Sequence, residues 1–123
     1  MGNHFAKITE VAAFDELTAR SQSRPVVIFK HSLTCPISSG AYEQLADFEG
    51  EVALIEVQRA RELSREIERR LGVTHESPQV ILLRNGQVVW NASHFDITTE
   101  AVADAVRAAG EKTEAEGRSS QQA

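Results

Sequence analysis

The chain has 123 residues, a formal net charge of −5 and one cysteine. This length suits one domain with its own core, and the negative charge argues against nucleic acid or an anionic membrane surface as partner. No apolar run approaches the roughly 20 residues that cross a bilayer, and the first residues lack a signal-peptide pattern. A lone cysteine excludes an intramolecular disulfide, which fits a reducing compartment. We therefore expect a cytoplasmic protein.

Apolar periodicity and turn signals predict alternating strands and helices. The expected strands cover 5–8, 26–29, 52–57, 80–83 and 87–90, and the expected helices cover 11–21, 36–48, 61–71 and 98–109. Helices between the first strands imply parallel crossovers, whereas Asn85-Gly86 indicates a tight hairpin and an antiparallel edge. This order predicts an α/β fold with a mixed sheet of four to five strands and helices on both faces.

Composition divides the chain into a domain over 1–109 and a tail over 110–123. The tail is polar and has no apolar anchor, so we expect it to be disordered.

Cys35 is the candidate nucleophile. It follows the apolar strand 26–29 by a short turn, and Pro36 after it is favoured at the first position of a helix. Cys35 is thus expected at the N-cap, where free N–H groups and the helix dipole help a thiol to lose its proton. Ser38 stands where a C-x-x-C motif has its second cysteine. The alternative is a buried cysteine that acts as a small hydrophobe, but Thr34, Pro36 and Ser38 are not a core pattern.

The ten residues 29–38, Phe-Lys-His-Ser-Leu-Thr-Cys-Pro-Ile-Ser, resemble the monothiol bacilliredoxin family of the thioredoxin superfamily. Ser77-Pro78-Gln79-Val80, the Asn-Gly turn and Trp90 fit the same family, and the resemblance covers about 5–109. It implies a thioredoxin-like fold. It also implies an enzyme, a thiol–disulfide oxidoreductase that removes bacillithiol from S-bacillithiolated client proteins by exchange onto Cys35.

The resemblance implies bacillithiol as co-substrate and no metal. Without a second thiol, another bacillithiol molecule, a bacillithiol disulfide reductase or another redox protein must release the adduct from Cys35. No set of lysines and arginines could be tied to the malate and sugar of bacillithiol by spacing alone.

The same resemblance assigns Thr34, Pro36, Ile37 and Ser38 to the active-site motif. The Ser38 hydroxyl could donate to the Cys35 thiolate, or it could simply suit a first helical turn.

The resemblance also assigns Ser77 and Pro78 to substrate positioning, with a cis bond between them. From sequence alone an X–Pro bond is cis in only about 5–6% of cases, so an ordinary trans proline at an edge strand is the alternative.

Two histidines are candidates for an electrostatic role. His31 precedes Cys35 and could add positive charge when protonated, and His75 precedes Pro78 and could approach Cys35. A zinc site built from these residues is disfavoured, because structural zinc usually has four protein ligands.

Other prominent residues receive structural interpretations. Lys30 and the charged segment 59–70 are expected on a solvated surface, and Trp90 and Phe95 are expected to pack in the domain.

Two rival functions remain open at this stage. One is a monothiol glutaredoxin-like iron–sulfur carrier, whose Cys-Gly-Phe-Ser motif Pro36 and Ile37 do not match. The other is a non-enzymatic thioredoxin-fold binding module in which Cys35 is inert.

Overall fold

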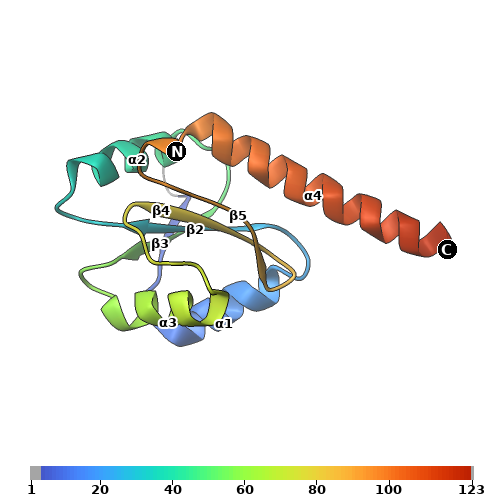
Figure 1. Cartoon of the computed structure of the whole chain (residues 1–123), viewed down its shortest axis with the longest axis horizontal. Coiled ribbons are helices and arrows are strands. Elements are labelled where there is room, and N and C mark those ends of the chain that lie inside the picture. Colours follow the sequence, from blue (N-terminus) through green and yellow to red (C-terminus); the bar gives the residue numbers. More distant parts are fainter. Residues whose placement is uncertain (1–3, 123) are drawn as a thin grey trace.

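The computed structural model describes the backbone of residues 4–122 and the side chains of residues 4–110. Strands and helices alternate in the predicted order (Figure 1). The elements are β1 (Phe5–Lys7), α1 (Val11–Arg20), β2 (Val26–His31), α2 (Pro36–Ala46), β3 (Val52–Glu56), α3 (Arg61–Leu71), β4 (Gln79–Arg84), β5 (Gln87–Ser93), the 3-10 turn η1 (His94–Asp96) and α4 (Thr99–Gln122).

The five strands form one mixed sheet in the order β1-β3-β2-β4-β5. Strands β1 and β2 are parallel to β3, whereas β4 is antiparallel to both β2 and β5. Helices α2 and α4 lie on one face of the sheet and α1 and α3 on the other (Figure 1). The mixed α/β sheet that the sequence predicts is therefore confirmed.

Strand β2 is central and all six of its residues are buried. Successive side chains of a strand point to opposite faces, so β2 contributes to two cores. Val27 and Phe29 pack with α2 and α4, whereas Ile28 packs with α1 and α3. This two-sided burial explains the continuous apolar run at 26–29.

The predicted hairpin and the predicted end of α3 have the backbone conformations that their residues favour. Asn85 and Gly86 both have positive φ, 59° and 75°, as the hairpin between β4 and β5 requires. Gly72 ends α3 with φ 69°, a left-handed conformation that costs glycine no Cβ clash.

Helix α4 continues along the backbone to Gln122, through the segment where composition favours a disordered tail. The side chains of 111–123 lie outside the described residues, so the disorder of this tail stays a prediction. Within the described part of the chain, no helix is long and apolar enough to span a membrane.

Two side chains correct the sequence interpretation. Lys30 is fully buried, because it belongs to the central strand and points towards α3 rather than towards solvent. Phe95 is 80% exposed, because η1 turns the chain outside both cores. The expected solvated lysine and the expected packed phenylalanine are therefore both wrong.

Candidate active site around Cys35

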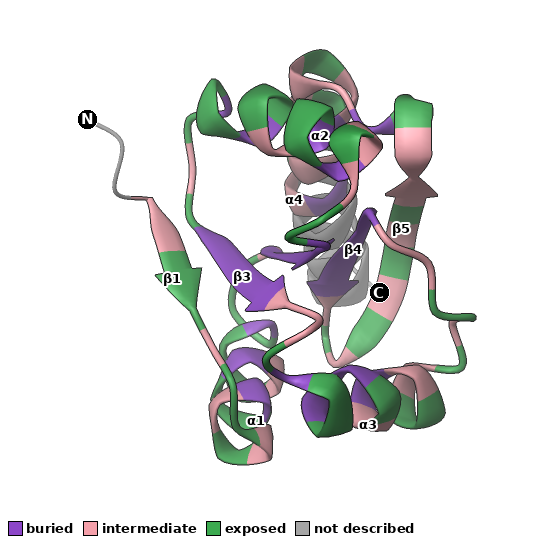
Figure 2. Cartoon of the chain, turned by 90° about the vertical axis from the view of Figure 1, so that its left-hand side faces the viewer, coloured by how far each residue is buried: buried purple, intermediate pink, exposed green. Residues whose placement is uncertain are grey.

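Cys35 is the N-cap of α2, with extended backbone (φ −106°, ψ 121°), and Pro36 is the first residue of the helix. Cys35 is partly exposed, so it is not a fully buried core residue. Figure 2 faces this end of the sheet, with α2 above the strands and α3 below them. The placement that Pro36 predicts is confirmed, and it sets the sulfur at the positive end of a helix dipole.

The Ser38 hydroxyl is bonded to the end of β2 and to the turn that follows it. It accepts the N–H of Ser32 at 2.9 Å and lies 2.7 Å from Nδ1 of His31. Ser38 is fully buried, and among the described residues its hydroxyl makes no hydrogen bond to Cys35. In this structure it anchors the first turn of α2 instead of donating to the sulfur.

His31 is buried beside this hydroxyl, with its ring centroid 5.3 Å from that of Phe29 and 5.1 Å from that of Tyr42. Burial lowers the pKa of His31, and the nearby Glu56 carboxylate opposes this only in part. The ring is therefore neutral near pH 7. It acts as a hydrogen-bonding partner of Ser38 rather than as a cation.

Gln58 holds the turn before Cys35, a role that the sequence analysis missed. Its Oε1 accepts the Leu33 N–H at 3.0 Å. Its Nε2 donates to the hydroxyls of Ser32 at 2.9 Å and Thr34 at 3.3 Å. Gln58 follows β3, and polar residues after parallel strands gather at one sheet edge, so its position could have indicated this role.

The Ser77–Pro78 peptide bond is cis. Pro78 is buried and precedes β4, which pairs with β2 through Lys30 and Gln79, so it lies beside the end of β2 that leads to Cys35. The carbonyl of Pro78 accepts the His94 N–H at 3.1 Å. The Ser77 hydroxyl is buried without a hydrogen-bond partner. Substrate positioning by Ser77 and Pro78 stays a prediction.

His75 lies against Lys30, on the face of β2 opposite to His31. The Lys30 ammonium donates to the Ser64 carbonyl at 3.2 Å, and its Nζ lies 3.2 Å from Nδ1 of His75. Burial lowers the pKa of Lys30 to about 8, against the opposing effect of Glu68. Burial and the Lys30 charge lower the pKa of His75. Neutral His75 thus accepts from Lys30, and no described contact joins it to Cys35.

Among the described residues, no group of three or more histidine, cysteine, aspartate or glutamate side chains is placed to hold a metal ion.

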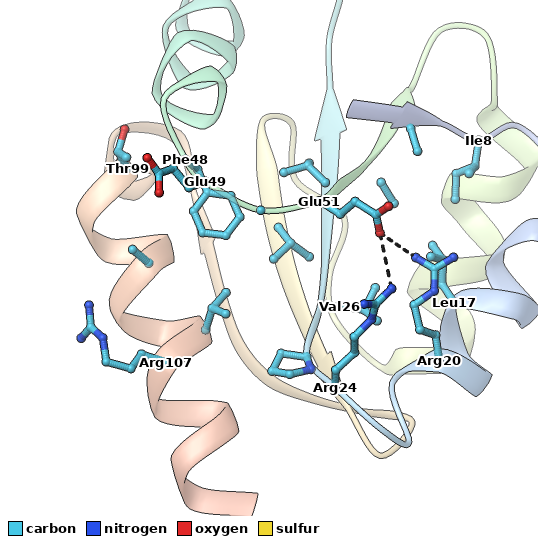
Figure 3. A pocket seen from close by; sticks show the side chains of 18 of the residues that line it. Ile8, Leu17, Arg20, Arg24, Val26, Phe48, Glu49, Glu51, Thr99 and Arg107 are labelled. Atoms are coloured by element: carbon cyan, nitrogen blue, oxygen red, sulfur yellow. Dashed lines mark hydrogen bonds and ion pairs between the residues drawn. The ribbon is translucent and has the colours of Figure 1, made fainter. Parts of the chain in front are cut away.

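A cavity of about 970 Å³ lies at the other end of the sheet (Figure 3). Val26 and Val52, at the starts of β2 and β3, line it together with residues of α1 and α4. Glu51 at its edge pairs with Arg20 at 3.0 Å and Arg24 at 3.7 Å. Because Cys35 follows the opposite end of β2, this cavity is separate from the thiol site.

The family model described as "Monothiol bacilliredoxin BrxC" matches residues 6–102. A solved structure described as a candidate oxidoreductase with a thioredoxin fold is 35% identical, with a TM-score of 0.75, over 82% of this chain and 92% of that one. Fasciola hepatica thioredoxin is 15% identical, with a TM-score of 0.66, over 83% and 96%. Thioredoxin F from spinach chloroplast is 17% identical, with a TM-score of 0.62, over 85% and 92%. The two thioredoxins show the fold alone, a thioredoxin fold.

Proposed function

The chain belongs to the monothiol bacilliredoxin family, and we propose that it removes bacillithiol from S-bacillithiolated proteins by exchange onto Cys35. Family and fold support a thiol–disulfide oxidoreductase in general. The observation that carries the specific proposal is the position of Cys35, a partly exposed residue at the N-cap of α2. Thiolate is the attacking species in such exchange, and a helix N-terminus favours it.

In the proposed step, the Cys35 thiolate attacks the bacillithiol sulfur of the mixed disulfide on a client. A disulfide forms between Cys35 and bacillithiol as the bond between bacillithiol and the client breaks. The client sulfur leaves with the electron pair and takes a proton from water. The disulfide is transferred, so no external oxidant or reductant is needed.

Release of the adduct requires a second thiol, because this chain has one cysteine and the Ser38 hydroxyl cannot form a disulfide. The thiolate of another bacillithiol attacks the adduct, which frees Cys35 and gives bacillithiol disulfide. A bacillithiol disulfide reductase or another redox protein then completes the cycle. A reducing compartment such as the cytoplasm suits it.

The test incubates the reduced protein with a bacillithiolated client and follows both proteins by intact mass spectrometry. We expect the client to lose one bacillithiol as Cys35 gains it. Cys35→Ser should neither accept the adduct nor speed its loss, whereas the exposed matched control Ser39→Ala should behave like wild type. Equal loss of bacillithiol with wild type and Cys35→Ser would contradict the proposal.

A further inference from the structure

A pocket of about 370 Å³ lies where β3 leads into α3, at the end of the sheet that Figure 2 faces. This volume is within the range of small-molecule sites. Its polar lining residues are Gln58, Arg61, Ser64, Arg65, Glu68 and His75.

The arginines of this pocket differ from their neighbours. Arg59 pairs with Glu56, and Arg69 and Arg70 pair with Glu66. Arg61 and Arg65, which line the pocket, have no carboxylate within 4 Å among the described residues. They are one helical turn apart, so their guanidinium groups can converge on one anion.

A third cation lies behind the pocket wall. The Lys30 ammonium contacts the Ser64 carbonyl and Nδ1 of His75, two residues of the lining. The one carboxylate of the lining, Glu68, accepts the His75 N–H at 3.0 Å and interacts with Lys30. Because Glu68 offsets Lys30, the charges of Arg61 and Arg65 remain unbalanced, although the chain as a whole is acidic.

The pocket adjoins the Cys35 site at two places. Gln58 lines it and contacts Ser32, Leu33 and Thr34, the residues directly before Cys35. His75 lines it and lies three residues before Pro78. The cationic pocket therefore borders the turn before Cys35 and the loop before Pro78.

We propose that this pocket binds the carboxylates of the small thiol during exchange at Cys35, with Arg61 and Arg65 as the residues that hold them. The inference rests on the proposed function, since it names what recognises the small thiol. Guanidinium groups pair with carboxylates in a bidentate geometry, and an acidic chain gains selectivity from such a local positive site.

The first test measures binding without turnover. L-malate, a small dicarboxylate, is titrated into the reduced full-length protein, and amide NMR shifts are followed. We expect saturable shifts at Ser64, Arg65 and His75, and affinity at least tenfold lower in Arg61→Gln/Arg65→Gln. Arg69→Gln, on the same helix but outside the pocket, should bind like wild type. Shifts elsewhere only, or equal affinity in the double variant, would overturn the proposal.

A parallel titration with inorganic phosphate tests whether the pocket prefers carboxylates to phosphate. Inorganic phosphate should bind more weakly than malate. Equal or tighter phosphate binding at the same amides would overturn the assignment to carboxylates.

The second test measures specificity during exchange. One client carries either bacillithiol or the uncharged thiol 2-mercaptoethanol, and kcat/KM is measured for both adducts. The ratio that favours bacillithiol should fall at least tenfold in Arg61→Gln/Arg65→Gln and stay unchanged in Arg69→Gln. An unchanged ratio in the double variant would overturn the proposal. If wild type exchanges neither adduct, the proposed function fails, and the malate titration still decides whether the pocket binds carboxylates.

Discussion

The hydroxyl of Ser38 lies 2.7 Å from Nδ1 of His31, in a fully buried position in the first turn of α2. Because it also accepts the Ser32 N–H, one side chain joins the helix that begins after Cys35 to the strand and turn that precede it. Ser38, which stands where a C-x-x-C motif has its second cysteine, therefore anchors the start of the helix that follows Cys35.

Removal of this anchor should destabilise the fold. We expect Ser38→Ala to lower the free energy of unfolding by about 1–3 kcal/mol, because the Ser32 N–H and the His31 ring lose a buried partner. Urea denaturation measures the change. Ser39→Ala, at the next and exposed position, should stay within about 0.5 kcal/mol of wild type. Equal stability of the two variants would contradict the anchoring role.

Acidification should destabilise the protein through His31. Its pKa is lowered from 6.5 by burial, so between 6.5 and the lower folded-state value the unfolded chain holds more protons. Stability therefore rises with pH in this window and is lost as the pH falls through it. Urea denaturation between pH 7 and pH 5 should show a shallower loss in His31→Gln than in wild type. An NMR titration should place the midpoint of His31 below 6.5, and a midpoint above it would contradict the burial argument.

Raising the pH above neutrality should increase the folding stability through Lys30. Its pKa falls from 10.5 to about 8 mainly by burial, so between these values the unfolded chain holds the proton and the folded chain does not. Folding stability then rises with pH across the window, by about 1–3 kcal/mol. Denaturation at pH 7.5 to 10 should show this rise in wild type and in Lys7→Met, whose lysine is half exposed. It should be absent in Lys30→Met, and an equal rise there would contradict the assignment.

Loss of Gln58 should slow exchange more than it weakens the fold. Gln58→Ala frees the turn 32–34 before Cys35, and misplacement of a reacting group is costly, so we expect about a tenfold lower rate constant for adduct transfer. Quenched time courses analysed by mass spectrometry measure this rate constant. Gln87→Ala, an exposed glutamine on β5, should react at the wild-type rate. A wild-type rate in Gln58→Ala would show that the turn holds its position without this side chain.

Two glycines should respond to alanine with opposite signs. Gly40 lies within α2 and an added Cβ meets nothing within 4 Å, so Gly40→Ala should stabilise by about 0.5–1 kcal/mol. Gly72→Ala should destabilise by about 1–2 kcal/mol, because its φ of 69° is unfavourable for a residue with Cβ. Thermal unfolding midpoints of the two variants should move in opposite directions, and a shift of the same sign in both would contradict one of these assignments.

Features that depend on neighbouring residues could be predicted from the amino-acid sequence. Pro36 sets the start of α2 and hence the N-cap position of Cys35, because its ring suits the first helical turn. Asn85-Gly86 and Gly72 set the hairpin and the end of α3 through backbone conformations that few other residues adopt. The buried run 26–29 identified the central strand.

Contacts between side chains that are distant in the sequence depend on the folded domain and could not be predicted. Lys30 and Ser64 are 34 positions apart and Lys30 and His75 are 45 positions apart, so no local pattern could show that these residues meet. For the same reason the pocket lined by Arg61 and Arg65 could not be separated from an ordinary charged helix face. A strand or a turn is encoded by its own backbone preferences, whereas a site depends on how distant segments stack on the sheet.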